Sequence, residues 1–257
     1  MRTNQVKAKI LSGGTAFGVF CNIYSPSIVE MIGHMGFDFV LIDAEHGPLG
    51  VESCEHMVRA AEGVGLPAFI RIAMNIRQNI LRYLDIGALG VQLPMINTPA
   101  EAKAVVEAVK YPPLGKRGLA GVRAADYGLT IPLKDYTVKA NQEILVVTQV
   151  ETMEAVSHLD ELLTIEGIDV FFIGPTDLSS SMGYPGQVNH PEVLAMIQKL
   201  VTRIRAVGRI AGTTAYNLEA LARAKELGFQ YLVHNVIAML SRSGREYLES
   251  ARGLKKP

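Results

Sequence analysis

Short apolar segments alternate with segments of helical apolar spacing along almost the whole chain of 257 residues, and this alternation most constrains the fold. Strict alternation of strand and helix predicts parallel strands joined by right-handed crossovers. The predicted strands cover residues 15–22, 37–45, 66–73, 90–96, 143–151, 168–177, 209–215 and 230–236. Eight such units in roughly 250 residues predict a closed (β/α)8 barrel, or TIM barrel, of the α/β class.

Helices are expected between the strands, and two connections are longer than the rest. The expected helices cover residues 26–36, 51–64, 76–84, 98–109, 132–141, 153–163, 192–207, 218–227 and 237–252. Thr98 is expected to cap one of them, with Pro99 in the first helical position. The long connections, 111–130 and 179–191, are predicted to be loops, and the first is rich in glycine and carries basic residues.

An open doubly wound sheet is the alternative to a barrel. It would need a glycine-rich phosphate-binding turn after an early strand, and the sequence has no G-x-G-x-x-G motif there. No segment has the composition of a linker, so we expect residues 1–257 to form a single domain.

Charge and cysteine content argue against several classes of partner. The 25 basic and 25 acidic side chains give a formal net charge of zero, whereas proteins that bind nucleic acid or anionic membranes carry a basic surplus. No apolar run approaches the roughly 20 residues that span a bilayer, and the N-terminus lacks the apolar core of a signal peptide. Cys21 and Cys54 lie in apolar surroundings, as expected of reduced cysteines in a cytoplasmic protein.

Polar residues gather at the predicted C-terminal ends of the strands, where (β/α)8 barrels place their reactive groups. The segment 37–50, FDFVLIDAEHGPLG, passes from a buried strand into Asp43, Glu45 and His46 before it turns. The other strand-end residues are Arg71, Gln149, Glu151, Thr176, Asp177, Thr213, Thr214, His234 and Asn235. Because apolar strands do not carry unpaired ionised groups, these residues predict a catalytic site rather than a polar surface turn.

Glu151 and Asp177 end consecutive strands and should therefore be neighbours at this rim. Two carboxylates brought together repel each other, and a divalent cation commonly neutralises them. Two oxygen ligands with positions left for water and substrate suit Mg²⁺ or Mn²⁺ better than Zn²⁺, which favours histidine and cysteine. Each acid also has an alternative role, because Glu151 could cap the next helix and Asp177 could cap the turn that follows it.

Two features that the sequence lacks limit the reaction mechanisms and substrates expected at this rim. None of the lysines lies at the end of a predicted strand, where an aldolase acting through a Schiff base would place a desolvated lysine. The loops after the seventh and eighth strands lack a glycine-rich phosphate cradle, which disfavours a phosphorylated substrate. Carbonyl chemistry at this rim is therefore expected to depend on a metal ion.

Six motifs together resemble those of one known family. They are LIDAEHGP (41–48), FIR (69–71), YLDIGALGVQLPM (83–95), YPPLGKRG (111–118), TQVET (148–152) and FIGPTDLSSSMG (172–183). Their order is similar to that in the class II, metal-dependent pyruvate aldolases of the HpcH/HpaI family, such as 4-hydroxy-2-oxoheptanedioate and 2-dehydro-3-deoxyglucarate aldolases. The resemblance runs from about residue 18 to residue 235.

The resemblance implies roles for particular residues. It implies that Glu151 and Asp177 hold the divalent metal, which would be Mg²⁺, Mn²⁺ or Co²⁺. The residues expected to be catalytic are His46, Arg71, Asp43 and Asp85, and those expected to bind substrate are Gln149, Gly174, Pro175, Thr176 and Asp177. Asp85, implied to sharpen the basicity of His46, follows the third helix and so falls at the wrong end of its own barrel. It would reach His46 only across a subunit interface or if the predicted boundaries are displaced, and the alternative is a purely structural residue in the turn that ends the helix.

The expected function is the reversible cleavage of a 4-hydroxy-2-oxo acid into an aldehyde and pyruvate. The reaction is expected to pass through a pyruvate enolate in both directions. His46 is expected to act as the base, and Arg71 to stabilise charge on the keto oxygen. The resemblance also implies a homohexamer in which the last helix is exchanged between subunits. The alternatives are a CoA-ester lyase of the citrate-lyase β-subunit type, a 2-oxo-acid decarboxylase and a catalytically silent barrel. The first strand ends in FCNIYSP, without the tryptophan often found there in the family, so the aldehyde is not predicted.

Overall fold

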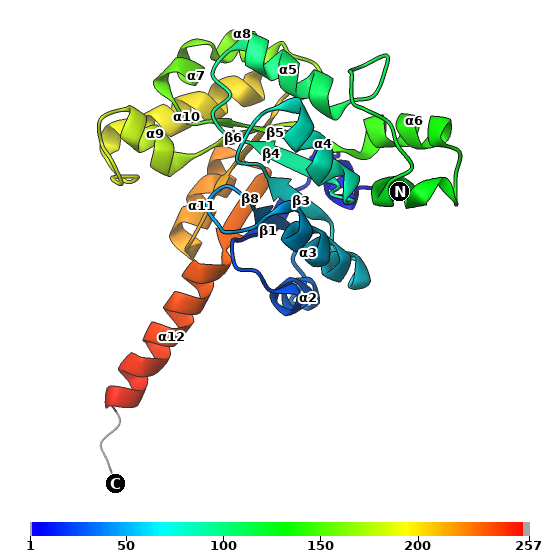
Figure 1. Cartoon of the computed structure of the whole chain (residues 1–257). Coiled ribbons are helices and arrows are strands. Elements are labelled where there is room, and N and C mark those ends of the chain that lie inside the picture. Colours follow the sequence, from blue (N-terminus) through cyan, green and yellow to red (C-terminus); the bar gives the residue numbers. More distant parts are fainter. Residues whose placement is uncertain (1, 254–257) are drawn as a thin grey trace.

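The computed structural model describes residues 2–253 and contains a closed barrel of parallel strands in the order β1 to β8 (Figure 1). The strands are β1 (Ala16–Cys21), β2 (Phe39–Asp43), β3 (Ala68–Arg71), β4 (Gly90–Leu93), β5 (Leu145–Val150), β6 (Val170–Ile173), β7 (Ile210–Thr214) and β8 (Tyr231–Asn235). Strand β8 closes the barrel against β1, with Gly18 opposite Val233. The predicted (β/α)8 barrel is confirmed, and the open doubly wound sheet is excluded.

Helices follow the strands in the predicted alternation. They are α1 (Gln5–Leu11), α2 (Pro26–His34), α3 (Val51–Gly63), α4 (Arg77–Asp85), α5 (Pro99–Val109), the 3-10 segment η1 (Arg123–Gly128), α6 (Leu133–Glu143), α7 (Met153–Ser157), α8 (Leu159–Leu163), α9 (Pro175–Ser181), α10 (Pro191–Ala206), α11 (Leu218–Leu227) and α12 (Val236–Gly253). The predicted cap of α5 is confirmed, because Thr98 forms a reciprocal capping box with Glu101 and Pro99 follows it.

Two segments differ from the sequence prediction. Residues 175–181 form α9, although the strand was expected to run to residue 177 and to be followed by a loop. Pro175 at the first helical position and the buried Leu178 favour this helix over the strand and loop. The helix expected over 153–163 is divided into α7 and α8 at His158, whose Nδ1 lies 3.1 Å from the carbonyl oxygen of Asn97.

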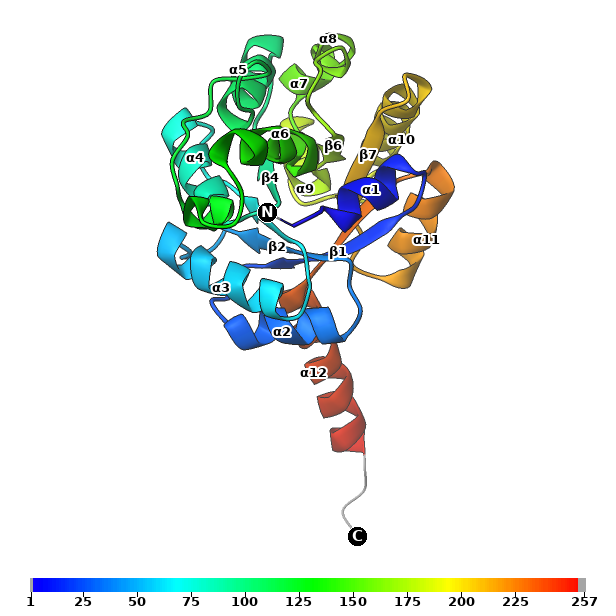
Figure 2. The same cartoon turned by 90° about the vertical axis from the view of Figure 1, so that its right-hand side faces the viewer.

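Aromatic side chains fill the interior of the barrel at its N-terminal end. The rings of Phe39 and Tyr231 stack with their centroids 4.6 Å apart, and Phe69 lies 5.1 Å from Phe39. Val6 and Ile10 of α1 pack into the same cluster, and α1 lies across this end of the barrel in Figure 2. Because this end is closed by apolar packing, the interior opens at the C-terminal ends of the strands.

The long basic connection packs against the N-terminal end of the barrel. Nη2 of Arg117 lies 2.7 Å from Oδ1 of Asp85, which ends α4. Arg123 is paired with Glu62 and donates a hydrogen bond of 2.7 Å to the carbonyl oxygen of Ile86. Both arginines are therefore used to fasten this connection to the barrel.

Lys110, at the end of α5, is a buried lysine far from the strand ends that form the rim. Its Nζ donates to the carbonyl oxygens of Asn141 (2.8 Å) and Ile144 (3.1 Å). Burial, together with the positive charge of Lys7, lowers the pKa of Lys110 to about 8. A desolvated lysine thus exists, but it fastens α5 to α6 at the N-terminal end of the barrel.

We expect the stability of the protein relative to a Lys110→Met variant to rise between pH 8 and pH 10.5. In this window the unfolded lysine is still protonated while the folded one is not, so unfolding takes up a proton and the free energy of unfolding grows with pH. The relative gain should reach a few kcal/mol, since one pKa unit corresponds to about 1.4 kcal/mol. Denaturant titrations at pH 7, 9 and 10.5 measure it. The exposed Lys103→Met variant should show no such trend, and a flat difference for Lys110→Met would contradict the prediction.

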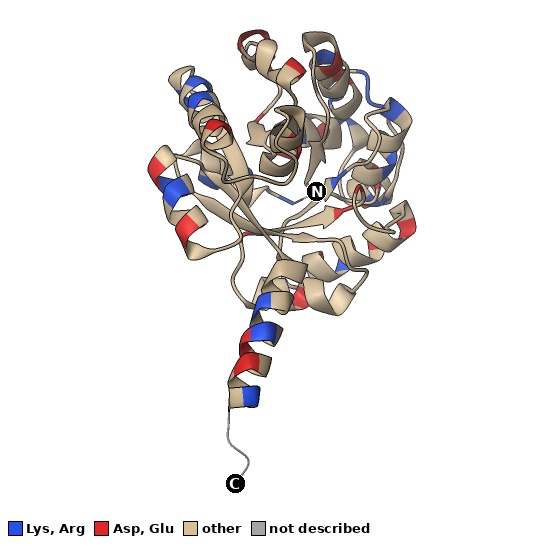
Figure 3. Cartoon of the chain, turned by 90° about the vertical axis from the view of Figure 1, so that its left-hand side faces the viewer, with Lys and Arg blue, Asp and Glu red and all other residues tan. Residues whose placement is uncertain are grey.

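Helix α12 begins directly after β8 and projects away from the barrel (Figures 1 and 2). None of its residues is buried, and Tyr247 is 73% exposed. Charged residues of both signs lie along the projecting part (Figure 3), while Ile237, Leu240 and Leu248 are exposed apolar residues of the same helix. Within residues 2–253, no helix combines the length and apolar character needed to span a bilayer.

Candidate active site

A cavity of about 330 Å³ opens at the C-terminal ends of the strands. It is lined by Phe20, Asn22, Asp43, His46, Arg71, Gln149, Glu151, Phe172, Gly174, Pro175, Thr176, Asp177, Thr214, Tyr216 and Asn235. Every residue expected to be catalytic, to bind substrate or to hold the metal lies on this wall, with the exception of Asp85, whereas the strand-end residues Glu45, Thr213 and His234 do not line it. The barrel therefore brings together side chains that are up to 215 positions apart, from Phe20 to Asn235.

Asp43 and Arg71 form a two-point ion pair on the neighbouring strands β2 and β3. Nε of Arg71 donates to Oδ1 of Asp43 (2.9 Å), and Nη2 donates to Oδ2 (2.6 Å). Burial alone would raise the pKa of Asp43, but the hydrogen bonds and charge of Arg71 outweigh it and hold this pKa below its usual range. The guanidinium also lies 4.5 Å above the ring of Phe20. Arg71 is thereby fixed through Nε and Nη2 of its guanidinium.

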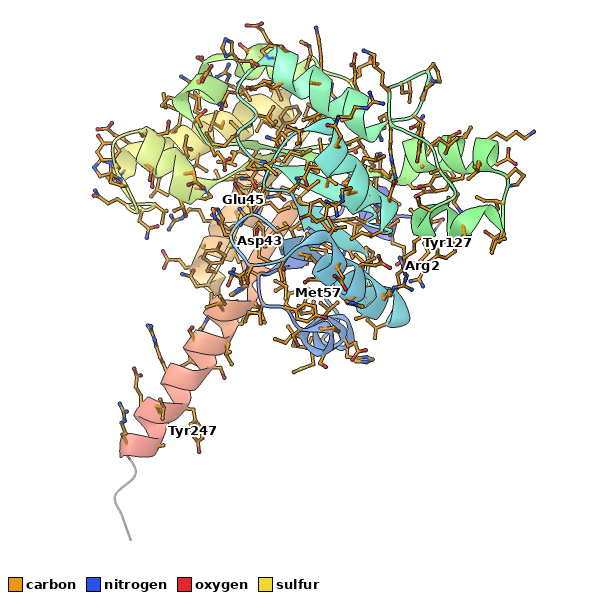
Figure 4. All side chains as sticks on the ribbon, viewed as in Figure 1. Arg2, Asp43, Glu45, Met57, Tyr127 and Tyr247 are labelled. Carbon is orange, nitrogen blue, oxygen red and sulfur yellow. The ribbon has the colours of Figure 1, made fainter. Side chains whose placement is uncertain are left out.

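The loop after β2 is fastened to the same aspartate. Oδ1 of Asp43 accepts the backbone N–H groups of Glu45 and His46, each at 3.2 Å. Oε2 of Glu45 lies 3.3 Å from Nε of Arg71 and 3.8 Å from Nε2 of His46. Figure 4 shows Asp43 and Glu45 close to each other in the barrel, above the base of α12. The His46 side chain is 60% exposed, so it can exchange protons with solvent or substrate.

Glu151 is a buried carboxylate, 2% exposed, immediately after β5. Its Oε1 accepts the backbone N–H of Met95 (2.8 Å), and its Oε2 accepts the amide of Gln149. Burial raises the pKa of Glu151 to about 7, and the nearby charges of Asp177 and Glu45 add to this rise. Met95 has a φ of +53°, a left-handed conformation that is uncommon for a residue other than glycine. This backbone presents its N–H to Glu151.

The carboxylates fit a divalent cation. Glu151 and Asp177 line one cavity and interact electrostatically, and burial disfavours the charge of Glu151 in the absence of a compensating ion. Among residues 2–253, no set of three or more His, Cys, Asp or Glu side chains is arranged to hold a metal ion. A cation held by Glu151 and Asp177 would therefore leave most of its coordination positions to water and substrate, an arrangement typical of Mg²⁺ sites.

Gln92 is a site residue that the sequence analysis missed. It lies in β4, is 0% exposed, and its Nε2 donates to Oε1 of Gln149 (2.7 Å), whose own amide donates to Glu151. Gln92 stands opposite Val147 in β5, so Gln149 is its diagonal neighbour on the same face of the sheet. The chain of amides fixes the orientation of Gln149 and directs its N–H at the carboxylate.

A Gln92→Leu substitution is expected to weaken Mn²⁺ binding by about tenfold or more. The variant frees the amide of Gln149 to rotate, and the loss of an outer partner of a ligating group commonly costs 10- to 100-fold in metal affinity. Calorimetric titration with Mn²⁺ measures the effect, and the exposed Gln198→Leu serves as the matched control. A lowered melting temperature with unchanged Mn²⁺ affinity would show that Gln92 is only part of the packing.

Asp85 is not brought into the cavity of its own chain. It is paired with Arg117 at the N-terminal end of the barrel, in agreement with the expected geometric difficulty. A larger cavity of about 850 Å³ also lies at this end, lined by residues that include Arg2, Glu62 and Tyr127. Arg2 and Tyr127 lie on the far side of the barrel from Asp43 in Figure 4. A role for Asp85 beside His46 remains a prediction that needs a second subunit.

The model of the HpcH/HpaI aldolase/citrate lyase family matches residues 16–240, which covers the whole barrel. The chain belongs to the HpcH/HpaI aldolase/citrate lyase family. The resemblance inferred from the six motifs is thereby confirmed.

Members of the HpcH/HpaI family with assigned names are similar to this chain over nearly its full length. A hydroxypyruvate/pyruvate aldolase of Sagittula stellata is 35% identical over 241 residues, covering 93% of this chain and 94% of the relative. A 2-keto-3-deoxy-L-rhamnonate aldolase of Klebsiella pneumoniae is 37% identical over 240 residues, covering 93% and 89%. The crystal structure of an HpcH/HpaI family protein from Burkholderia cenocepacia superposes with a TM-score of 0.92 at 29% identity, covering 98% and 100%. The expected aldolase, a carbon–carbon lyase, agrees with the names of both relatives.

Proposed function

We propose that this member of the HpcH/HpaI family is a metal-dependent aldolase of the cytoplasm that cleaves and forms 4-hydroxy-2-oxo acids, with pyruvate and an aldehyde as the two parts. The observation that carries the proposal is that the buried Glu151 and the exposed Asp177 share one cavity with the fixed guanidinium of Arg71. The names of the relatives support the reaction class.

Glu151 and Asp177 would hold the divalent cation, for which Mg²⁺, Mn²⁺ and Co²⁺ are the candidates. When bound, such an ion supplies Lewis acidity toward the carboxylate and keto oxygens of a 2-oxo acid. Gln149 and the backbone of Gly174, Pro175 and Thr176 lie on the same wall and would position the carboxylate of the substrate. The reacting carbon would thus be held at a defined place in the cavity.

Arg71 and His46 would carry out the charge stabilisation and the proton transfer. In cleavage, His46 removes the proton of the C4 hydroxyl group, the C3–C4 bond breaks, and its electron pair passes to the pyruvate part as an enolate. Nη1 of Arg71 would stabilise the negative charge that develops on the keto oxygen. Protonation of the enolate at C3 then completes pyruvate. Asp43 holds both Arg71 and the His46 backbone, so its contribution would be to position them.

The alternatives are less well supported. A lyase for CoA esters should present a basic patch to the adenosine phosphates. The candidates for it in the long basic connection are already paired: Lys116 with Glu107, Arg117 with Asp85 and Arg123 with Glu62. A catalytically silent barrel does not require the buried acids, arginine and histidine to converge on one cavity, and here they do.

The proposal is tested by following pyruvate release from 4-hydroxy-2-oxo acids with lactate dehydrogenase. Activity should be lost after treatment with EDTA and restored by Mg²⁺, Mn²⁺ or Co²⁺. Parallel assays with oxaloacetate and with a citramalyl-type CoA ester examine the decarboxylase and the CoA-ester lyase. Turnover of 4-hydroxy-2-oxo acids that survives EDTA, or faster metal-dependent turnover of either alternative substrate, would contradict the proposal.

We also propose that the protein is a homohexamer in which α12 packs on a neighbouring subunit. The apolar residues Ile237, Leu240, Tyr247 and Leu248 are exposed on a helix that projects from its own barrel. Exposed apolar stripes of this kind are typical of interfaces.

A Leu240→Glu substitution is expected to shift the protein from a hexamer to smaller species, because it places a charge in the apolar stripe of α12. Light scattering coupled to gel filtration gives the mass of each species. Ser250→Glu adds the same charge to α12 outside the stripe and should leave the mass unchanged. A wild-type protein that elutes as a monomer at micromolar concentration would contradict both the hexamer and the exchange of α12.

A further inference from the structure

The wall of the active-site cavity has two chemically different halves. The side chains that ionise come from the ends of β2, β3, β5 and β6. The other half, from the ends of β7, β8 and β1, consists of Asn22, Thr214, Tyr216 and Asn235 together with Phe20. These three strands are consecutive in the closed barrel, so the uncharged side chains form one continuous surface. The proposed function uses only the charged half.

Asn22 carries a buried acceptor without a donor. Its Oδ1 has no hydrogen-bond partner among the described residues, although buried polar atoms are nearly always paired. The backbone of Asn22 packs tightly against the loop that follows His46, because a Cβ at Gly47 would lie 2.9 Å from the carbonyl oxygen of Asn22. Asn22 therefore lies beside the loop that follows the proposed base, and its amide is the hydrogen-bonding group of this part of the cavity wall.

Asn235 and Tyr216 complete this surface with hydrogen-bonding groups. Oδ1 of Asn235 accepts the N–H groups of Ile237 (2.8 Å) and Ala238 (3.2 Å), which fixes the amide and leaves its Nδ2 as a donor. The centroid of the Tyr216 ring lies 5.8 Å from that of His234, and Tyr216 lines the cavity together with Thr214. Asn22, Tyr216 and Asn235 together offer acceptors and donors but no charge.

A surface of this composition discriminates between classes of aldehyde. A second carboxylate or a phosphate would lose hydration there, and none of Asn22, Tyr216 and Asn235 supplies a counter-ion, which makes its binding costly. An alkyl chain would cover the amide and hydroxyl groups without hydrogen bonding them, which is also unfavourable. An uncharged chain with hydroxyl groups avoids both costs, and the cavity volume of about 330 Å³ lies at the small end of the range for ligand sites.

We propose that Asn22, Tyr216 and Asn235 form the aldehyde subsite of this enzyme and select short, uncharged hydroxyaldehydes. This inference rests on the proposed function, in which the charged half of the cavity binds pyruvate. It adds the chemical class of the second substrate, which neither the family nor the charged half specifies.

The test compares aldehydes as partners of pyruvate in the direction of carbon–carbon bond formation. The panel contains glyceraldehyde, glycolaldehyde, propanal, succinic semialdehyde and glyceraldehyde 3-phosphate, each with the Mn²⁺-loaded enzyme. The wild-type kcat/KM for glyceraldehyde is expected to exceed that for propanal by about tenfold or more, since each added hydrogen bond is worth roughly two- to tenfold. The two charged aldehydes should be poorer still. An equal or greater kcat/KM for propanal or for either charged aldehyde would overturn the inference.

Two variants test the named residues. Tyr216→Phe removes only a hydroxyl group and should lower the ratio of kcat/KM for glyceraldehyde over propanal by about threefold to tenfold. Asn22→Ala should lower the same ratio independently. This variant provides the test if the Tyr216→Phe variant does not fold. Because the ratio is measured within each variant, a general loss of activity cancels. Tyr127→Phe, at the other end of the barrel, should keep the wild-type ratio, and unchanged ratios in both cavity variants would overturn the inference.

Exchange of the methyl protons of pyruvate in D₂O, followed by NMR, separates this inference from the proposed function. Exchange requires formation of the enolate but no aldehyde. Metal-dependent exchange combined with a preference for alkyl or charged aldehydes overturns the aldehyde subsite and leaves the proposed aldolase intact. Absence of exchange, together with absence of turnover for the whole panel, overturns both.

Discussion

Replacement of Arg71 by alanine should lower kcat for pyruvate release by about 10²- to 10³-fold, the cost commonly found when a donor to a developing oxyanion is removed. The guanidinium is fixed on three sides, by the two oxygens of Asp43, by Glu45 and by the ring of Phe20. An enolate oxygen would therefore meet a donor that needs no reorganisation. Arg71→Lys should recover only part of the activity, because an ammonium group cannot bind Asp43 at two points and still reach the substrate.

The measurement must separate catalysis from folding, since Arg71→Ala leaves the buried carboxylate of Asp43 without its partner. Circular dichroism, thermal melting and Mn²⁺ affinity should therefore accompany the kinetics. The exposed Arg205→Ala is the control for loss of an arginine. If folded Arg71→Ala with normal Mn²⁺ affinity keeps the wild-type kcat, Arg71 has no part in stabilising the transition state.

Glu151→Gln is the second change for which we expect a large effect. It should reduce Mn²⁺ affinity by more than about 100-fold, since it removes one of the two proposed charged ligands and even indirect partners contribute 10- to 100-fold. Turnover should fall by about 10³-fold or more, because Lewis-acid stabilisation is worth several kcal/mol. Calorimetry with Mn²⁺ and the coupled pyruvate assay give the two quantities.

Glu154→Gln is the matched control for this change. It makes the same substitution three residues further along the chain, on the exposed surface of α7. Its Mn²⁺ affinity and turnover should equal those of the wild type. Wild-type Mn²⁺ affinity in Glu151→Gln would disprove the assignment of Glu151 as a metal ligand, and the proposed mechanism would need a different origin for its Lewis acid.

The fold was predictable because each strand–helix unit carries its own local signals. Apolar runs of strand length, the cap at Thr98 and Pro99, and short connections each agree with the barrel. Helix α9 was missed because its serines resemble a loop in composition, and the burial of Leu178, which favours the helix together with Pro175, is a tertiary effect. The break between α7 and α8 depends likewise on a tertiary contact, that of His158 with Asn97.

The charged part of the site was predictable because ionised residues at the ends of apolar strands are conspicuous. Gln92 was not predictable as a site residue, because a neutral amide within a short strand has no sequence signal of its own. Its role depends on register, which sets it opposite Val147 and next to Gln149. The same holds for Asn22 and Tyr216, which lie just beyond strand ends and become site residues only when the barrel closes. Asp85 lies away from His46 within a single chain, as its position after the third helix had predicted.

Asn235 belongs to two parts of the molecule at once, because it lines the cavity and its side chain holds the first turn of α12. A helix seated on a neighbouring subunit would therefore set the position of one wall of the cavity. Specific activity should then vary with enzyme concentration, falling on dilution as subunits separate and recovering on concentration. Assembly in this enzyme would act as a condition for turnover, so that an isolated barrel with every catalytic side chain in place would still work poorly.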